Sequence, residues 1–279
     1  AIHPLCPERE FFGRRREIDY ICSRATEPHK LLPGMFLAGK RWVGKTEVLR
    51  RVYQWLFWNQ AGIAPIYYQF KTGTLTEDFA GDYILETVKQ CLAFIKRDSQ
   101  VINANPTLNE LEKMLMEVDL SGVAELISNY NEAKRDGDYT AALKNAVRAP
   151  HILSHQWNIP VFLILDDTNR IAGKGHSREW SAIVEECGNL LRHDSFSFLM
   201  AGATRRILPG EALNGAVEVI ELAGLEEELA TSLMVELCRH NSTQYDTEIL
   251  AIAARKLEGN PMYLKSIVWS ASKMGRGLA

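Results

Sequence analysis

The chain has 279 residues, of which 46% are hydrophobic and 24% charged, and its formal charge is −3. This length and composition are typical of a soluble globular protein with one large domain or two smaller ones. The charge excludes a wholesale nucleic-acid coat but not a local basic patch. No apolar run approaches the roughly 20 residues of a membrane span, and no signal peptide opens the chain, so we expect a cytoplasmic protein without membrane association.

Cysteine and histidine spacing gives no sign of a structural metal site. The five cysteines are odd in number and widely spaced, so we expect reduced thiols. His151 and His155 stand four residues apart, as metal ligands on a helix do, but no acidic residue lies near them. We therefore do not expect this pair to hold a metal ion.

The first expected elements are a helix, a strand and a second helix. Residues 17–25 have a helical apolar rhythm, which prolines at 28 and 33 end. The apolar run 35–38 indicates a short buried strand, and residues 47–56 again show apolar positions at helical spacing.

Between that strand and that helix, residues 39–46 fit G-x-x-x-x-G-K-[ST], the phosphate-binding loop of nucleoside triphosphatases. The two glycines let the backbone curl so that successive N–H groups converge on the β- and γ-phosphates. Lys45 adds a positive charge for binding and catalysis, and the Thr46 hydroxyl is placed to bind Mg²⁺. The nucleotide-binding residues predicted from this loop are Gly39, Val43, Gly44, Lys45 and Thr46.

A long helical stretch separates this loop from the next central strand. Residues 63–70 are rich in β-branched and aromatic residues and indicate a strand, and residues 77–97 form an amphipathic helix. Residues 98–150 are polar and helical, and Thr107 with Glu110 has the pattern of a capping box. We expect this stretch to be the family-specific elaboration.

An acidic pair follows the next strand. Residues 161–165 are uniformly apolar, as in a central parallel strand, and lead into Asp166 and Asp167. Ligands bind beyond the carboxyl ends of such strands. We expect Asp166 to hold Mg²⁺, through water, and Asp167 to orient or deprotonate an attacking water. A simple strand-to-turn acid pair is the alternative. Asp in place of a longer Glu suggests slow turnover.

A third loop of the same edge supplies arginines. Residues 178–193 indicate a helix, and residues 196–201 a strand that leads into Thr204, Arg205 and Arg206. We assign Arg205 as the sensor of the terminal phosphate, with Thr204 and Arg206 left open. The alternative is that both arginines are solvated loop residues.

The character of the chain changes near Gly224. Residues 217–222 indicate a last short strand, and residues 226–273 contain only helices, broken at 259–261. Alternating strands and helices favour a parallel sheet covered on both faces. We therefore predict an α/β nucleotide-binding domain over residues 1–224 and a small helical lid subdomain over residues 225–279.

Four motifs in this order resemble the AAA+ superfamily and, within it, the STAND class of signal-transducing NTPases, which is NB-ARC-like. Residues 11–17 look like the F-x-G-R-x-x-E box, residues 39–46 match Walker A, residues 163–167 resemble Walker B, and residues 259–264 look like the G-x-P motif of the lid. The resemblance covers about residues 8 to 270.

The resemblance implies a P-loop AAA+ three-layer sandwich in which an extra strand lies between the Walker A and Walker B strands. It implies that Phe12, Gly13 and Arg14 pack beside the adenine, that Pro261 touches the base, and that the cofactors are ATP or ADP with Mg²⁺. The fuller STAND pattern also has sensor and effector parts beyond the lid. This sequence departs from it, since no winged helix and no repeat array follow the lid, and we expect a fragment that lacks those parts.

The leading functional hypothesis is a slowly hydrolysing ATP switch whose lid angle follows the nucleotide. Its output would be self-association or binding of an unidentified protein, with an arginine of a neighbouring subunit completing the site. The candidates for that arginine are Arg178, Arg192 and Arg206. One alternative is a DNA-associated ATPase of the initiator or transposition-regulator type, disfavoured by the acidic run 226–228. Another is a nucleotide-binding scaffold that has lost hydrolysis.

Overall fold

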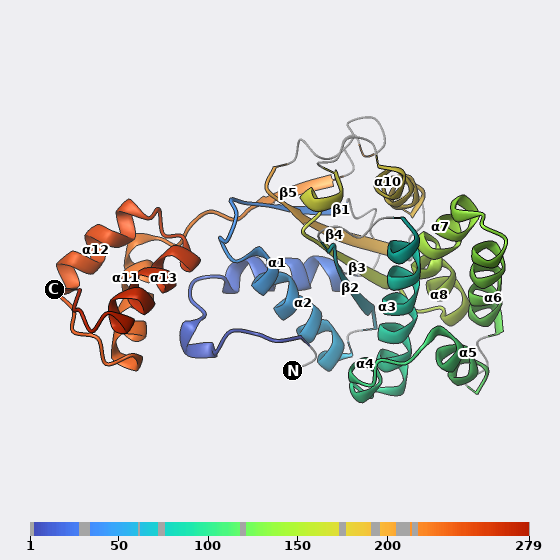
Figure 1. The fold of residues 1–279 in the computed structure, drawn as a ribbon, viewed down its shortest axis with the longest axis horizontal. Coiled ribbons are helices and arrows are strands. Elements are labelled where there is room, and N and C mark those ends of the chain that lie inside the picture. Colours follow the sequence, from blue (N-terminus) through green and yellow to red (C-terminus); the bar gives the residue numbers. More distant parts are fainter. Residues whose placement is uncertain are drawn as a thin grey trace.

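The fold was analysed in a computed structural model, which describes residues 3–27, 34–60, 62–71, 76–117, 121–172, 177–190, 196–204, 213 and 217–278. Figure 1 shows an α/β body with the C-terminal helices at one end and a group of helices at the other. In the described residues, no helix has both the length and the hydropathy of a membrane span.

The centre of the body is a five-stranded sheet in which every described pairing is parallel, in the order β2-β3-β4-β1-β5. The strands are β1 (Gly34–Ala38), β2 (Ala64–Gln69), β3 (Val161–Asp166), β4 (Phe196–Gly202) and β5 (Val217–Glu221). Strand β4 lies between β1 and β3, which confirms the expected extra strand between the Walker A and Walker B strands. Because the strands are parallel, their carboxyl ends meet at one edge.

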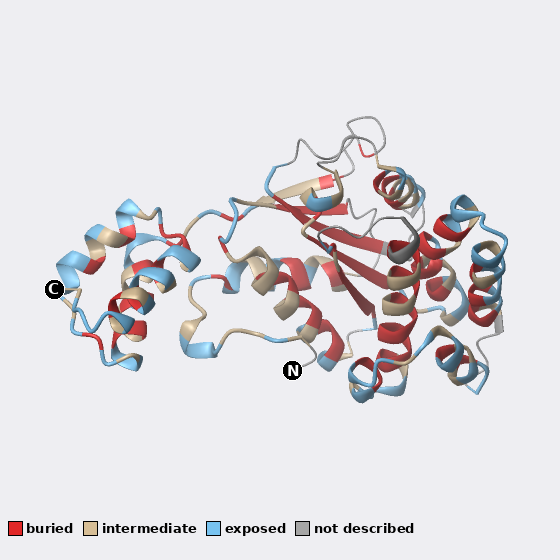
Figure 2. Ribbon diagram, in the orientation of Figure 1, coloured by how far each residue is buried: buried red, intermediate tan, exposed pale blue. Residues whose placement is uncertain are grey.

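The sheet is buried because helices cover it. Every residue of β3 is buried, which explains its uninterrupted apolar sequence. Helix α1 (Arg15–Thr26) packs on α2 (Lys45–Asn59), and α2 packs on β2 and β3. Helix α3 (Thr76–Lys96) also contacts β2, and α10 (Arg178–Leu190) contacts β4. Figure 2 shows the buried residues concentrated in the strands and in the helix faces turned toward them.

The expected elaboration between β2 and β3 is a set of helices that packs on α3. It comprises α4 (Gln100–Asn103), α5 (Leu108–Met116), α6 (Ser121–Arg135), α7 (Tyr139–Val147) and α8 (Ala149–Trp157). The predicted capping box is present at the start of α5, where the Thr107 amide donates to the Glu110 carboxylate over 2.7 Å and the Glu110 amide donates to the Thr107 hydroxyl over 3.3 Å. The short helix α9 (Asn169–Ala172) follows β3.

The free edge of β2 is closed by a side chain. Gln90 on α3 is fully buried, and its amide accepts from the Tyr67 N–H over 2.7 Å and donates to the Tyr67 carbonyl over 2.8 Å. This side chain satisfies two groups that another strand would otherwise satisfy.

The C-terminal helices form a unit with its own core. They are α11 (Glu227–His240), α12 (Thr247–Lys256) and α13 (Pro261–Lys273). The main core extends along the chain to Leu222, and a second buried cluster begins at Leu225. These separate clusters support a domain division near Gly224, which we retain as a proposal. We call residues 225–278 the lid.

Two glycines let the backbone cross itself where the lid begins. A Cβ on Gly224 would lie 1.8 Å from the Glu258 carbonyl oxygen, and one on Gly259 would lie 1.9 Å from the Leu225 carbonyl oxygen. Gly259 also has a φ of +60°, and its carbonyl accepts from the Leu225 N–H over 2.9 Å. Only glycine allows this close approach.

The N-terminal segment, residues 3–10 with the short 3₁₀ helix η1 (Glu8–Glu10), connects the body to the lid. Gln54 on α2 donates to the His3 carbonyl over 2.8 Å, and the His3 ring lies 4.8 Å from the Tyr53 ring and 4.6 Å from the Tyr67 ring. At the other end, Lys265 of α13 pairs with Glu10 at 2.9 Å.

Candidate functional site

The phosphate loop has the tight backbone that its sequence requires. A Cβ on Gly39 would lie 2.6 Å from the Leu222 carbonyl oxygen and 2.9 Å from Val43, so glycine alone fits there. Gly44 precedes α2 with a φ of +104°, and Trp42 also has a positive φ, of +66°. The loop therefore curls directly before the positive end of α2, where backbone N–H groups favour an anion.

Lys45 lies at the centre of this curl. Its ammonium donates to the Gly39 carbonyl over 2.7 Å and to the Lys40 carbonyl over 2.9 Å. Burial lowers the pKa of this amine, while the charges of Asp166 and Asp167 oppose that shift. The loop thus holds a cation at the carboxyl edge of the sheet, facing the acidic pair.

Asp166 ends β3 and is fully buried. Its carboxylate accepts from the Tyr67 hydroxyl over 2.9 Å and from the Asp167 amide over 2.8 Å, and it also bonds the Thr46 side chain. Burial raises the pKa of Asp166, and these hydrogen bonds oppose the shift. The structure therefore brings together the two residues predicted to hold Mg²⁺, Thr46 and Asp166.

Asp167 turns outward from the same strand end, with a φ of +58°. Its Oδ2 accepts from Gln69 Nε2 over 3.1 Å and lies 3.1 Å from Nη2 of Arg170 on α9. Unlike Asp166, this carboxylate is partly exposed and can reach a water molecule at the sheet edge. Two donors hold it in one orientation, as a positioned acid or base requires.

The loop and Asp167 border a cavity of about 620 Å³, and the fully buried Asp166 is not among its lining residues. Its lining residues are Arg41, Trp42, Gly44, Lys45, Thr46, Glu47, Asp167, Asn169, Arg170, Ala203 and Met262. We call it the phosphate cavity, since Lys45, Thr46 and Asp167, which sequence analysis assigned to phosphate, metal and water, line it.

A smaller and more apolar cavity of about 170 Å³ lies on the other side of the loop. Predicted base-binding residues Phe12, Arg14 and Pro261 line it together with Val43 and Gly44. Gly13 is absent from the lining, but its φ of +66° and the close approach of Leu229 fix the chain there. Trp42, Gly44, Glu47 and Met262 border both cavities, so the two form neighbouring parts of one cleft between the sheet edge and the lid.

Arg14 joins the loop to the segment that leads into the lid. Its side chain is buried and donates to the Val43 carbonyl over 3.3 Å and to the Ala223 carbonyl over 2.5 Å. Its Nε has no partner in the described structure, and burial lowers the pKa of the guanidinium. This unsatisfied donor lies beside the base cavity, where a polar atom of a ligand could accept from it.

The lid also contacts three successive loop residues. The Asn260 side chain donates to the Arg41 carbonyl over 3.1 Å, Lys40 pairs with Glu258, and the rings of Trp42 and Tyr263 meet edge to face at 5.6 Å. Asn260 is buried, and its Oδ1 also accepts from the Met262 amide at the start of α13. The phosphate loop and the start of α13 are therefore in direct contact.

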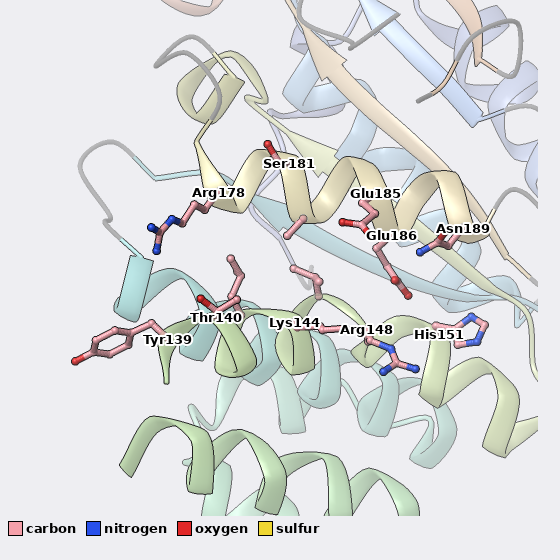
Figure 3. A pocket seen from close by; sticks show the side chains of 13 residues that line it. Tyr139, Thr140, Lys144, Arg148, His151, Arg178, Ser181, Glu185, Glu186 and Asn189 are labelled. Atoms are coloured by element: carbon pink, nitrogen blue, oxygen red, sulfur yellow. The ribbon is translucent and has the colours of Figure 1, made fainter. Parts of the chain in front are cut away.

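The structure does not describe all of the predicted arginines. Arg192, Arg205 and Arg206 lie outside the described residues. Arg178 borders a separate cleft between α7, α8 and α10 (Figure 3). Within the described part of the chain, no three His, Cys, Asp or Glu side chains form a metal cluster, and all five cysteines are free.

Sequence analysis missed Tyr67, Gln69 and Arg170. The first two stand at the carboxyl end of β2, which pairs with β3 so that Gln69 lies opposite Asp166. The predicted strand over 63–70 did point to this end, but its neighbour in the sheet was needed to place Gln69 beside the acidic pair. Arg170 lies one helical turn after Asp167, a spacing that the sequence did show.

The residues fit a magnesium ion. Mg²⁺ commonly takes only one or two protein ligands and fills its remaining positions with phosphate oxygens and water. The Thr46 hydroxyl and the buried Asp166 carboxylate offer that number and type of ligand, beside a loop where only glycine fits. When bound, the ion would neutralise phosphate charge.

Comparison with solved structures identifies the fold. Over 99% of this chain and 71% of its own, the Walker-type ATPase PABY2304 of Pyrococcus abyssi aligns with a TM-score of 0.57 and 12% identity. The Aeropyrum pernix Orc1 protein in complex with DNA aligns with a TM-score of 0.57 and 13% identity. The alignment covers 97% of this chain and 63% of the Orc1 chain. Cdc6p from Pyrobaculum aerophilum gives 0.50 and 14% identity, over 99% of this chain and 66% of its own.

The fold is therefore that of the AAA+ P-loop ATPases, with an all-parallel sheet and the phosphate loop after β1. The chain spans about two thirds of the length of these proteins. No protein-family model matches the chain, and no curated protein matches it.

Proposed function

We propose that this chain is an ATP-binding, slowly hydrolysing switch that couples the state of its nucleotide to movement of the lid and, through it, to self-association or partner binding. One observation carries the proposal: the loop that holds Lys45 is bonded through Lys40, Arg41 and Trp42 to lid residues 258–263. The bound ligand and the lid must therefore share one loop conformation.

The chain's residues have separate roles in this scheme. Lys45 and the backbone N–H groups of the loop bind the β- and γ-phosphates, while Thr46 and Asp166 hold Mg²⁺. Asp167, oriented by Gln69 and Arg170, positions the attacking water and accepts its proton. Phe12, Val43 and Pro261 enclose the base. Arg205 remains our proposed sensor of the γ-phosphate. We also propose that an arginine of a neighbouring subunit completes the nucleotide site.

The apolar contact of the lid with the phosphate cavity suggests how the signal is transmitted. Met262 is the lid residue in the lining of that cavity, and it cannot bond a phosphate. The lid instead holds the loop, so a change in phosphate number would act on the lid through the loop backbone. The STAND-type assignment and the cytoplasmic location stay proposals as well.

Calorimetry and hydrogen exchange on the intact chain test this function together. We expect Mg-ATP and Mg-ADP both to bind, and to give different amide protection in residues 257–264. Helices α5 and α6 provide the internal control, because they lie away from the cleft and should exchange equally in both states. Absence of a heat of association with either nucleotide would contradict the proposal, and identical protection would contradict the lid coupling.

A DNA-associated ATPase is the second candidate. It is favoured by the Aeropyrum pernix Orc1 structure, which was solved in complex with DNA and has the same fold. The formal charge of −3 does not supply a broad cationic surface. Titration of duplex DNA at two salt concentrations distinguishes the candidates, because ATP-dependent binding that weakens steeply with salt indicates phosphate contacts. Salt-independent or undetectable binding would remove this candidate.

A further inference from the structure

A second cleft lies between α10 on one side and α7 with the start of α8 on the other (Figure 3). Its volume is about 750 Å³, larger than the phosphate cavity. Except for Arg178, it contains no residue that the nucleotide site was expected to use. We call it the α7–α10 cleft.

The lining residues follow the length of both helices. On α10 they stand at positions 178, 181, 182, 185, 186 and 189, the spacing of one continuous helical face. On α7 and α8 they run from Tyr139 to His151 with the same rhythm. A cleft that extends along about three turns of two helices is a groove, and its length of about 20 Å suits a third helix better than a small molecule.

The floor of the groove is apolar and its walls are charged. Leu143, Val147 and Ala182 form apolar lining, with the first two almost fully buried. Small residues at 181 and 182 leave room for another backbone to approach α10. An amphipathic helix places an apolar stripe against such a floor and polar residues against such walls.

The walls carry basic side chains without partners. Within the described part of the chain, the side chains of Lys144, Arg148 and Arg178 have no hydrogen bond and no ion pair, although all three line the groove. One acidic wall residue, Glu185, is also unpaired, whereas Glu186 has a partner. Among the unpaired lining residues, positive charges therefore outnumber negative ones, although the whole chain has a formal charge of −3.

These charges are unevenly distributed. Figure 3 shows Arg178 with Tyr139 and Thr140 at one end of the groove, and Glu185 and Glu186 toward the other end, near Arg148 and His151. Two carboxylates in one wall disfavour a nucleic acid, which presents phosphates along its whole length. A helix can instead confine its acidic residues to the positions that meet Lys144, Arg148 and Arg178. Its remaining positions can face the two glutamates without a negative charge.

We infer that the α7–α10 cleft is a docking groove for an acidic amphipathic helix of a partner protein. Leucine-like residues of that helix pack on Leu143, Val147 and Ala182, and its carboxylates pair with Lys144, Arg148 and Arg178. This function is additional to nucleotide binding and does not depend on it.

The test uses two synthetic helical peptides of about 16 residues with leucines at i, i+3, i+4 and i+7 spacing. One carries glutamates beside the leucines, and the other carries lysines at the same positions. Fluorescence anisotropy with the full chain should show at least about tenfold tighter binding of the glutamate peptide. Equal binding of both peptides, or tighter binding of the lysine peptide, would overturn the inference.

Matched variants locate the binding. The triple change Lys144→Glu, Arg148→Glu, Arg178→Glu should weaken the glutamate peptide by about tenfold or more. The control Lys96→Glu, Lys113→Glu, Lys134→Glu alters charge equally on exposed positions outside the groove and should change affinity by less than about twofold. Ser181→Trp fills the groove without changing charge and should also weaken binding. Thermal melts establish that each variant is folded.

A nucleic-acid arm completes the experiment. A fluorescent oligo(dT) of about 20 nucleotides is titrated against the native chain and the triple groove variant. If the oligonucleotide binds and the groove variant abolishes that binding, while neither peptide binds, the groove serves a nucleic acid and the inference fails. If the control variant loses the peptide as much as the groove variant does, general charge attraction accounts for the result and the inference also fails.

Discussion

The nucleotide cleft and the α7–α10 cleft are both lined by basic side chains, but their charges are satisfied differently. In the nucleotide cleft, Lys45 bonds loop carbonyls, Lys40 pairs with Glu258, and Arg14 bonds two backbone carbonyls. In the α7–α10 cleft, Lys144, Arg148 and Arg178 have no such partner in the described structure. The first cleft is organised by the fold before any ligand arrives, whereas the second leaves its charges available at the surface.

This difference has a structural origin. The contacts of the nucleotide cleft join segments more than 200 residues apart in the chain, such as Asn260 with Arg41. The α7–α10 cleft lies between helices that are close in the chain, and its lining residues come only from positions 139–151 and 178–189. A ligand in the first cleft would have to replace internal contacts, whereas the basic side chains of the second have no such contacts to give up in the described structure.

Gly259→Ala should have the largest effect, because it breaks the crossing on which the nucleotide cleft depends. The new Cβ would lie 1.9 Å from the Leu225 carbonyl oxygen at a φ of +60°. We expect a loss of about 4 kcal/mol in the free energy of unfolding, from overpacking and backbone strain. Urea denaturation measures it.

Gly275→Ala is the matched control for that change. Gly275 has a φ of +62°, but a Cβ there would meet nothing within 4 Å. Strain alone should cost about 1 kcal/mol. Equal losses in the two variants would show that the close crossing at Gly259 is unimportant.

Lys45→Ala should follow in size. Removing the cation that faces the phosphates should weaken Mg-ATP binding at least about 100-fold, about 3 kcal/mol. Lys96→Ala is the control, since it removes an equal charge at an exposed position outside the lining of both cavities and should change affinity by less than about threefold. Calorimetry measures both, and unchanged affinity in Lys45→Ala would refute the site assignment.

Asp167→Ala separates a hydrolysing switch from a scaffold. Loss of the carboxylate that Gln69 and Arg170 orient should reduce ATP turnover about 100-fold with little change in affinity. Asp82→Ala, at the same side of the sheet and paired with Lys71, should leave turnover unaltered. Phosphate release gives the rates. Equal, negligible turnover in the native chain and in Asp167→Ala would instead support the scaffold alternative.

The smallest expected effect concerns His3, which anchors the N-terminal segment. Burial, aided by the nearby charges of Arg50 and Lys89, lowers the pKa of His3 from 6.5 to about 4. Between pH 6.5 and pH 4, His3 binds a proton in the unfolded chain but not in the folded chain. The free energy of unfolding therefore has its full value above pH 6.5 and falls as the pH drops to 4. The loss should be about 2 kcal/mol.

Urea unfolding at several pH values, with His3→Phe, measures this contribution. The variant should lose less stability between pH 6.5 and pH 4 than the native chain. His155→Phe, at an exposed position, should keep the native pH dependence. A native pH profile in His3→Phe would show that other groups govern stability in this range.

The sequence predicted the parts of this molecule that local patterns determine. The phosphate loop needs glycines at fixed positions, and the burial of β3 on both sides requires its uninterrupted apolar run. The capping box at Thr107 was confirmed for the same reason. The position of the extra strand was confirmed as well, but the family resemblance had implied it, not a local pattern.

Contacts between distant segments could not be predicted in this way. The donors to Asp167 come from β2 and α9, and nothing in the spacing of Gln69 and Asp167 reveals that they meet. The bonds of Arg14 to Val43 and Ala223 likewise depend on where the lid begins in space. The α7–α10 cleft follows no motif at all, since its residues are ordinary charged and apolar positions on two helices.

The amide of Gln90 has a consequence for how this protein behaves at high concentration. Because one side chain occupies both main-chain groups of Tyr67, α3 acts as a substitute neighbour for the outermost strand. If α3 shifted, the main-chain groups at the edge of β2 would be exposed. An exposed strand edge can pair with a strand of another molecule and start aggregation. One uncharged glutamine thus protects this strand edge, at the same residue whose hydroxyl bonds Asp166.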